Sequence, residues 1–176
     1  MEPILCPAGT FSNVRGLTAV NECQACPAGF YCVVAGLVMP SGPCHAGYYC
    51  PPGQQLSTAY ICPTGHYCPE KSPKPLICAS GSYQPLQAQA SCTPCDAGYY
   101  CDNRQGPVSD ITLYPCPRGY FCLAGTQFAT QFGCPLGTFS PQKGLQDSSG
   151  CLPCAAGMFC SEVGLAAPTG EEDFES

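Results

Sequence analysis

The sequence predicts a small disulfide-rich repeat protein of short β-hairpins and loops, with little or no helix. Two observations carry this prediction. Cysteine accounts for 18 of the 176 residues, whereas Val, Ile, Leu and Phe together make up less than a fifth. A six-residue core, Cys-x-x-Gly-x-aromatic, recurs nine times along the chain. Since the chain has so few large apolar residues, we expect disulfides to replace a conventional hydrophobic core.

The repeated core defines repeats 1 to 9 by their leading cysteines, which are 16 to 21 residues apart. Each leading cysteine is followed three positions later by glycine and two positions after that by Phe or Tyr. Glycine tolerates positive φ and can turn the chain sharply, and the ring is expected to pack within its own repeat. The leading cysteines are Cys6, Cys26, Cys44, Cys62, Cys78, Cys95, Cys116, Cys134 and Cys154.

Two kinds of repeat differ in where the second cysteine falls. In three long repeats it comes late, three residues before the next leading cysteine, at Cys23, Cys92 and Cys151. In six short repeats it follows the aromatic residue directly. These early cysteines are Cys32, Cys50, Cys68, Cys101, Cys122 and Cys160. Together with the leading cysteines, they account for all 18, so an oxidised chain needs no unpaired thiol.

The long repeats divide the chain into three sets, each opening with one of them. Residues 1–77 hold one long and three short repeats, 78–133 one long and two short, and 134–165 one long and one short. Residues 166–176 are predicted to be an acidic, disordered tail. Pro- and Gly-rich loops separate the repeats, so we expect no helix beyond a turn or two. Two-stranded ribbons are predicted within Val108–Tyr114 and Gln127–Phe132, where β-forming residues gather.

The density of cysteine predicts an extracellular or cell-surface location, because disulfides persist only in oxidising compartments. The residues before Cys6 carry no basic start and no long apolar stretch, so no signal peptide is evident. We therefore expect a segment of a longer secreted or membrane-anchored protein. The alternative is a truncated chain left in the cytosol with reduced thiols.

Cys6-Pro-Ala-Gly-Thr-Phe, followed by the late Cys23 and its Cys-x-x-Cys step to Cys26, resembles the ephrin-receptor-like cysteine-rich repeat. It is also similar to the first module of TNF-receptor cysteine-rich domains. The resemblance extends from residue 6 to about residue 160 and implies an elongated rod of disulfide-linked modules. The many short Cys-x5-Cys repeats depart from both families. No ligand specificity follows from the resemblance.

The resemblance implies that Cys6 pairs with Cys23, Cys78 with Cys92 and Cys134 with Cys151. It implies interleaved pairs between adjacent short repeats: Cys26 with Cys44, Cys32 with Cys50, Cys95 with Cys116 and Cys101 with Cys122. Cys62 with Cys68 and Cys154 with Cys160 would then pair locally. Local pairing in every short repeat also accounts for all the cysteines, and the spacing is compatible with both arrangements.

The residues give little support for an enzyme, a nucleic-acid-binding protein or a membrane-spanning protein. The two histidines, His45 and His66, occupy variable positions of the repeated core, and no catalytic motif accompanies them. We therefore expect no enzyme and no cofactor. The net charge of −6, with only 6 Lys and Arg, argues against nucleic-acid binding. No apolar stretch approaches the length of about 20 residues needed for a membrane span.

A reduced, metal-binding cytosolic protein is the alternative hypothesis, because Cys-x-x-Cys occurs three times. These pairs lie more than 50 residues apart, whereas a structural zinc site places two of them within about 20 residues. The sequence therefore favours a non-catalytic extracellular module that spaces other domains or binds a protein partner. Candidate contact residues form one apolar cluster without a role in the repeat: Val33, Val34, Leu37, Val38 and Met39.

Overall fold

A computed structural model describes residues 2–171, and these form short strands, turns and loops. Every strand has two residues, and each of the three 3₁₀ helices has three. The strands are β1 Thr10–Phe11, β2 Gln24–Ala25, β3 Phe30–Tyr31, β4 Gly42–Pro43, β5 Tyr48–Tyr49, β6 Tyr60–Ile61, β7 His66–Tyr67, β8 Leu76–Ile77, β9 Ser82–Tyr83, β10 Thr93–Pro94, β11 Thr138–Phe139, β12 Leu152–Pro153, β13 Met158–Phe159 and β14 Gly170–Glu171. The 3₁₀ helices are η1 Val20–Glu22, η2 Ile111–Leu113 and η3 Ser148–Gly150. The predicted fold class, a small disulfide-rich hairpin protein, is confirmed.

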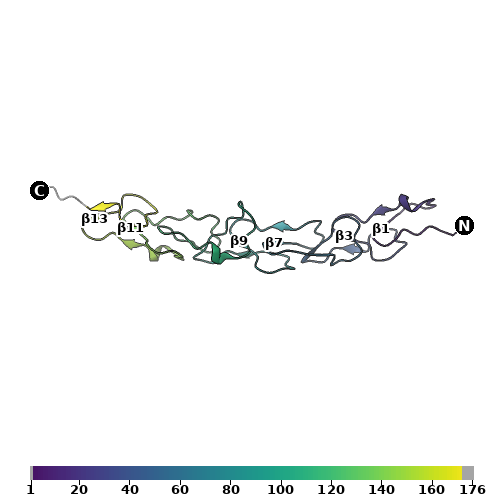
Figure 1. Cartoon of the computed structure of the whole chain (residues 1–176), viewed down its shortest axis with the longest axis horizontal. Helices are drawn as coiled ribbons and strands as arrows, with labels where there is room; N and C mark the ends of the chain where they lie inside the picture. Colours follow the sequence, from purple (N-terminus) through teal and green to yellow (C-terminus); the bar gives the residue numbers. More distant parts are fainter. Residues whose placement is uncertain (1, 172–176) are drawn as a thin grey trace. The chain divides into compact units, whose positions relative to one another are not determined.

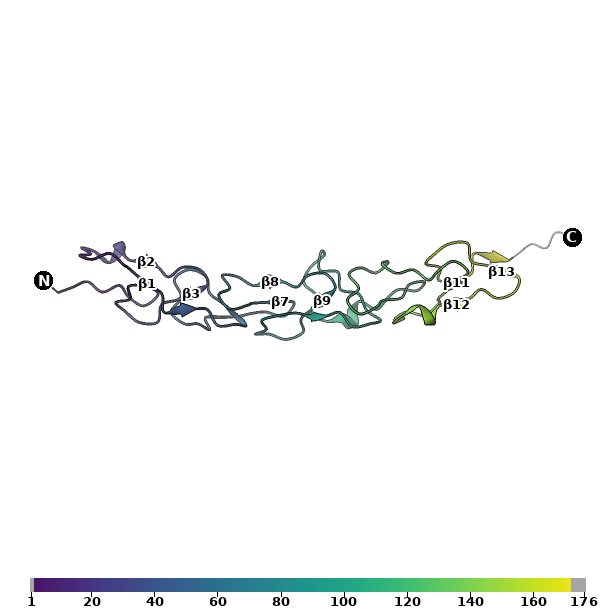
Figure 2. The ribbon, with the colours of Figure 1, turned by 180° about the vertical axis from the view of Figure 1, so that it is seen from behind.

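The strands pair into two-stranded antiparallel ribbons, and Figure 1 shows the strands following one another in chain order within each unit. The first strand of a ribbon ends with the core aromatic, and in every ribbon except β13–β14 the second ends immediately before the next leading cysteine. In the first ribbon, for example, Thr10 pairs with Ala25 and Phe11 with Gln24. Seen from behind in Figure 2, β1 lies beside β2, and β7 beside β8. Each ribbon from β1–β2 to β11–β12 therefore links one repeat to the next.

The chain divides into two compact units. Unit 1 comprises Met1–Ile77 with Leu86–Cys92, and unit 2 comprises Cys78–Pro85 with Thr93–Ser176. Unit 1 contains the ribbons β1–β2, β3–β4, β5–β6 and β7–β8, and unit 2 contains β9–β10, β11–β12 and β13–β14. The same repeated geometry builds both.

The core glycine occupies the turn that its position in the sequence predicts. In repeat 2 the backbone N–H of Phe30 donates to the carbonyl of Pro27 at 3.1 Å, which closes a four-residue turn around Gly29. Gly29 has a φ of +86°, and the equivalent glycines all have φ between +74° and +92°. Positive φ at the third position of a β-turn favours glycine strongly, because an L side chain is strained there.

Consecutive repeats are joined by four backbone hydrogen bonds, which we call the junction. Between repeats 1 and 2, Gly9 N–H donates to Cys32 and Ser12 N–H to Leu37. In the same junction, Gly36 N–H donates to Cys6 and Cys26 N–H to Gly9. All four bonds recur between repeats 2 and 3, 3 and 4, 6 and 7, 7 and 8, and 8 and 9, with N to O distances of 2.7 to 3.1 Å throughout. The backbone, rather than side-chain packing, therefore carries the contact between repeats.

The short repeats close locally. Cys26 bonds to Cys32, and the equivalent pairs are Cys44 with Cys50, Cys62 with Cys68, Cys95 with Cys101, Cys116 with Cys122 and Cys154 with Cys160. The interleaved arrangement that the resemblance implied is therefore wrong. The tight turn explains this, since it returns the chain and brings the Cα atoms of Cys26 and Cys32 to 5.9 Å, within disulfide range.

The long repeats follow the same backbone path as the short repeats, but their leading cysteine bonds to the late cysteine. Cys6 bonds to Cys23 and Cys134 to Cys151, and Cys78 and Cys92 are disulfide-bonded as well. The position that holds the early cysteine in short repeats is occupied here by Ser12, Gln84 and Ser140, which are 7%, 4% and 0% exposed. Their N–H groups make the same junction bond as the early cysteines.

Capped 3₁₀ turns precede two of the late cysteines. Glu22 accepts hydrogen bonds from the N–H groups of Thr18 and Ala19, and η1 is followed directly by Cys23. Asp147 accepts from the N–H of Ser149, and η3 is followed directly by Cys151. These turns fold the extra length of the long repeat so that the late cysteine returns to its leading partner.

The two predicted ribbons in the middle of the chain are not formed. In place of a strand in Val108–Tyr114, Asp110 caps the 3₁₀ turn η2, because its carboxylate accepts the N–H of Thr112 at 2.9 Å. Val108 and Ile111 are buried in a small cluster with Cys95 and Cys101. Gln127–Phe132 also contains no strand. In Val108–Tyr114, burial of apolar side chains and a local cap outweigh the β propensity.

The predicted tail begins later than residue 166. Gly170 and Glu171 form β14, which pairs with β13 in the last described ribbon. The expectation of disorder for residues 172–176 lies outside the described residues.

Candidate interaction surface

The apolar loop that contains the candidate contact residues, Val33–Met39, is fixed by hydrogen bonds at its first residue and in its middle. The N–H of Val33 donates to the Ser41 hydroxyl at 2.9 Å. Gly36, with φ +81°, donates its N–H to the carbonyl of Cys6, and the Leu37 carbonyl accepts the N–H of Ser12. The loop is therefore held against repeat 1 by its backbone, which leaves most of its side chains free of the interior.

The candidate residues differ in exposure. Val33 and Val34 are 46% and 53% exposed, and Val38 and Met39 are 64% and 66% exposed. Leu37 is only partly exposed, as expected from its place in the junction with repeat 1. Four of the five predicted contact residues thus form an apolar surface, and the fifth has a structural role.

A groove adjoins this loop in unit 1, with a volume of about 220 Å³. Its walls come from the segment before the first repeat, from repeat 1 and from the apolar loop. Leu5 lies over Gly36, and Leu5 and Val14 are about 60% exposed. The apolar lining residues are Pro3, Ile4, Leu5, Val14, Leu17, Leu37 and Val38. An apolar groove beside an exposed apolar loop is typical of a protein-binding surface.

The pKa values of three carboxyl groups are shifted by capping hydrogen bonds in 3₁₀ turns. Hydrogen bonds from the backbone N–H groups of Ala19 and Thr18 lower the pKa of Glu22. Bonds from Thr112 to Asp110 and from Ser149 to Asp147 lower the pKa of each of these carboxyl groups. Each carboxylate therefore caps its own 3₁₀ turn and is stabilised in the charged form there.

The side chain of each histidine contacts a residue of its own turn. The Nδ1 atom of His66 lies 2.9 Å from the carbonyl oxygen of Thr64 in its own turn. His45 contacts the ring of Tyr48 at a centroid distance of 6.2 Å. Both histidines thus act as members of their local turns, in separate repeats.

Every cysteine is bonded to another, so the three Cys-x-x-Cys steps hold disulfide sulfurs rather than thiolates. Within residues 2–171, no three His, Cys, Asp or Glu side chains are grouped so as to hold a metal ion. The described part of the chain also contains no helix with the length and apolar character needed to cross a bilayer.

The sequence reasoning missed a second conserved geometry within the repeat. In the loops of seven of the nine repeats, one residue with positive φ contributes the junction N–H: Gly36, Gly53, Lys71, Ala88, Gly125, Gly144 and Gly164. The spacing of this residue from the leading cysteine varies, so it does not stand out as a fixed position of the repeat. The second glycine in most repeats was nevertheless an available signal.

Comparison with protein-family models found no match to this chain, and comparison with curated proteins found none either. The resemblance to ephrin-receptor-like and TNF-receptor-type repeats therefore rests on the residues of the repeat alone.

Proposed function

We propose that this chain is a non-catalytic extracellular module that spaces neighbouring domains and binds a protein partner through the apolar loop. The observation that supports this most directly is the pairing of all the cysteines, which requires an oxidising compartment. We also propose that the parent protein is an adhesion, receptor-like or matrix protein, because the repeat resembles the ephrin-receptor-like repeat.

The spacer role is supported by the junction. A chain of repeats joined by four backbone hydrogen bonds each, with a disulfide inside every short repeat, resists bending within a unit. The partner role is supported by the exposure of Val38 and Met39, because large apolar side chains exposed together mark interaction surfaces.

The oxidation state is tested by producing the chain behind a signal sequence and measuring its intact mass without reductant. Nine disulfides lower the mass by about 18 Da relative to the all-thiol chain and leave nothing for iodoacetamide to alkylate. A secreted product with alkylatable thiols, or one that binds zinc stoichiometrically, would contradict the proposal.

The contact surface is tested by binding of the fluorescently labelled, oxidised chain to intact cells and to extracellular-matrix surfaces. The double variant Val38→Ser/Met39→Ser should keep the oxidised mass and lose most binding, since both side chains are exposed. The control Leu113→Ser removes an equally exposed apolar side chain in unit 2 and should bind like the parent chain. Equal binding by all three proteins would place the contact elsewhere.

A further inference from the structure

The residue that faces the core aromatic varies from repeat to repeat. Phe11 faces Gln24 across the β1–β2 ribbon, whereas Tyr67 faces Leu76 across β7–β8. In three repeats of the described chain, the core aromatic contacts a second aromatic ring from the following segment. These pairs are Tyr49 with Tyr60, Tyr100 with Tyr114 and Phe121 with Phe132. Two of the three pairs therefore bring two phenol groups together.

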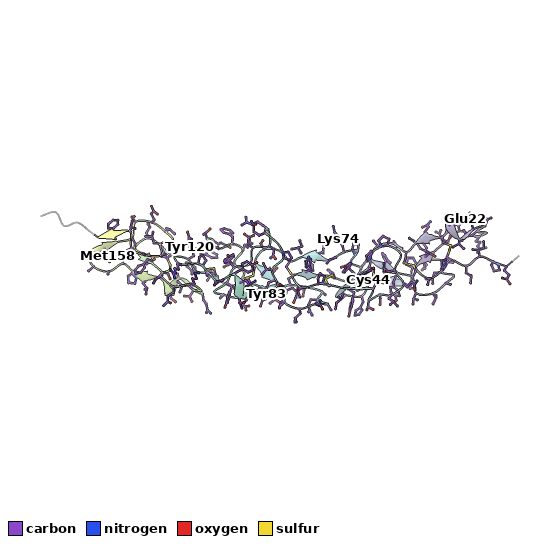
Figure 3. All side chains as sticks on the ribbon, viewed as in Figure 1. Glu22, Cys44, Lys74, Tyr83, Tyr120 and Met158 are labelled. Carbon is purple, nitrogen blue, oxygen red and sulfur yellow. A yellow bond between two sulfur atoms is a disulfide. The ribbon has the colours of Figure 1, made fainter. Side chains whose placement is uncertain are left out.

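Tyr49 and Tyr60 are held face to face by the β5–β6 ribbon. Their ring centroids are 5.3 Å apart, and the ring planes differ by 23°. The antiparallel register places Tyr49 directly opposite Tyr60, so both side chains lie on the same face of the ribbon. The pair belongs to repeat 3, whose leading Cys44 is labelled in Figure 3. The backbone therefore fixes the two phenols in a stacked arrangement before any reaction takes place.

Stacked phenols have the geometry that oxidative coupling requires. Loss of one electron and one proton converts a phenol into a phenoxyl radical, whose unpaired electron occupies an orbital perpendicular to the ring. Two stacked radicals direct these orbitals at each other, and coupling is fast because both partners are already in place. Tyr100 and Tyr114 differ, since their ring planes are 68° apart and one ring meets the other edge-on.

An oxidant can reach the stacked pair from solvent. Tyr60 is 46% exposed, whereas Tyr49, Tyr100 and Tyr114 are all only partly exposed. A cavity of about 360 Å³ adjoins the Tyr60 ring and is lined by side chains of the segment from Gly53 to Tyr60. The chain contains no tryptophan, and its cysteines are bonded in disulfides, so neither indoles nor thiols compete for oxidation.

We propose that Tyr49 and Tyr60 are a modification site, at which a haem peroxidase and hydrogen peroxide join the two rings as dityrosine. Each phenol loses one electron and one proton, and a carbon–carbon bond forms between the ring carbons next to the oxygen-bearing carbons. The hydrogen on each of these carbons then moves to the phenol oxygen. Hydrogen peroxide takes up the two electrons and two protons and leaves as two molecules of water.

The cross-link closes a segment that the disulfides leave open. Cys44 bonds to Cys50 and Cys62 to Cys68, so residues 51–61 lie outside both bridges. A bond between Tyr49 and Tyr60 joins the two strands of the ribbon that connects repeats 3 and 4, and this restricts the unfolded chain as a disulfide does. This modification goes beyond the proposed spacer role and does not depend on the apolar loop or its partner.

The test is treatment of the oxidised chain with a haem peroxidase and hydrogen peroxide, followed by dityrosine fluorescence, intact mass and peptide mapping after reduction. A chain concentration of about 1 μM favours coupling within one molecule over coupling between molecules. The product should be a monomer that has lost two hydrogen atoms, with a single new bond between the peptides that contain Tyr49 and Tyr60.

Phenylalanine variants identify the phenols that react. Tyr60→Phe keeps a ring beside Tyr49 but lacks the phenol, so it should lose the cross-link while retaining nine disulfides by mass. The control Tyr114→Phe makes the same change in the edge-on pair of unit 2 and should cross-link like the parent chain. If Tyr60→Phe does not form its disulfides, Tyr49→Phe replaces it.

Three results would overturn the proposal. The first is a parent chain that forms no dityrosine or couples only between molecules. The second is a cross-link between Tyr100 and Tyr114 in place of the one between Tyr49 and Tyr60. The third is a Tyr60→Phe variant that forms as much dityrosine as the parent chain, because the stacked pair would then not be the site of coupling.

Discussion

At the scale of single residues, the turn glycine meets two separate requirements. Its φ is positive, and in most repeats its Cα lies against a carbonyl from two repeats later. In unit 2, Gly119 is subject to both requirements, whereas Gly157 is subject only to the first. Their φ values are +84° and +83°, but a Cβ on Gly119 would lie 2.4 Å from the Gly164 oxygen, whereas one on Gly157 meets no atom of residues 2–171 within 4 Å.

Gly119→Ala should therefore lower the free energy of unfolding more than Gly157→Ala does. The strained φ costs each variant about 1 kcal/mol, and the clash adds about 1 to 3 kcal/mol to Gly119→Ala alone. Guanidinium denaturation of the oxidised proteins, followed by tyrosine fluorescence, measures the difference. Equal losses would mean that the contact two repeats away is not maintained in solution.

Two loop positions carry a residue other than glycine in spite of their positive φ. Lys71 has φ +70° and Ala88 has φ +59°. The Lys71 side chain gains a contact in return, because its ammonium nitrogen lies 5.0 Å from the centre of the Phe30 ring. The structure provides Ala88 with no such compensation.

Ala88→Gly should stabilise the oxidised chain by up to about 1 kcal/mol, since relief of the left-handed strain exceeds the added entropy of the unfolded glycine. The matched control is Gly53→Ala at the same position of repeat 3, where an added Cβ meets no other atom. It should destabilise by about 1 kcal/mol. Thermal unfolding followed by circular dichroism measures the direction of the stability change in both variants. A destabilised Ala88→Gly variant would show that the backbone at Ala88 is not strained.

At the scale of the repeat, the bridges differ in their protection from solvent. Cys26, Cys32, Cys95, Cys101, Cys116 and Cys122 are fully buried, whereas Cys23 and Cys151 are partly exposed. The difference follows from the repeat itself. The early cysteine lies inside the junction, and the late cysteine ends a surface 3₁₀ turn.

Limited reduction should therefore open Cys6–Cys23 and Cys134–Cys151 before Cys95–Cys101 and Cys116–Cys122, because a reductant must reach the sulfur atom. The order is measured by brief treatment with a phosphine at low pH, alkylation and peptide mapping. The buried bridges serve as the internal control. Simultaneous loss of all bridges would show that reduction proceeds through global unfolding.

At the scale of the whole chain, disulfides and backbone hydrogen bonds replace a hydrophobic core. Val108 and Ile111 are the buried aliphatic residues among the described ones, and cysteines make up the remaining buried apolar residues. The Tyr120 ring, labelled in Figure 3, packs on Gly164, two repeats along the chain, rather than in a shared interior. The chain therefore has no reserve of buried apolar area to support it without its bridges.

Full reduction should abolish the fold without denaturant. Each short bridge closes a loop of about seven residues and contributes about 2 kcal/mol by the chain-entropy estimate, so losing all of them exceeds the stability of an ordinary domain. Amide proton dispersion in an NMR spectrum before and after reduction tests this. A reduced chain that keeps its dispersion would mean that the junctions alone suffice.

The sequence alone determined the repeat, the turn at each core glycine and the completeness of disulfide pairing, because these depend on local spacing and residue type. Glycine three residues after cysteine predicts a tight turn whatever the surroundings. The apolar loop was also visible as a cluster, although Leu37 could not be separated from its exposed neighbours without the junction bond to Ser12.

Only the tertiary structure decided which cysteines pair, how each repeat contacts the two that follow it, and where the strands lie. Cys26 has potential partners at two spacings, and the choice depends on the path of the chain through the turn. The ribbons lie next to the leading cysteines, rather than in the segments richest in β-forming residues, because the junction aligns the backbone there. Backbone contacts between repeats mark the sequence only through glycines at positions of positive φ, and such a glycine does not identify the carbonyl that it contacts.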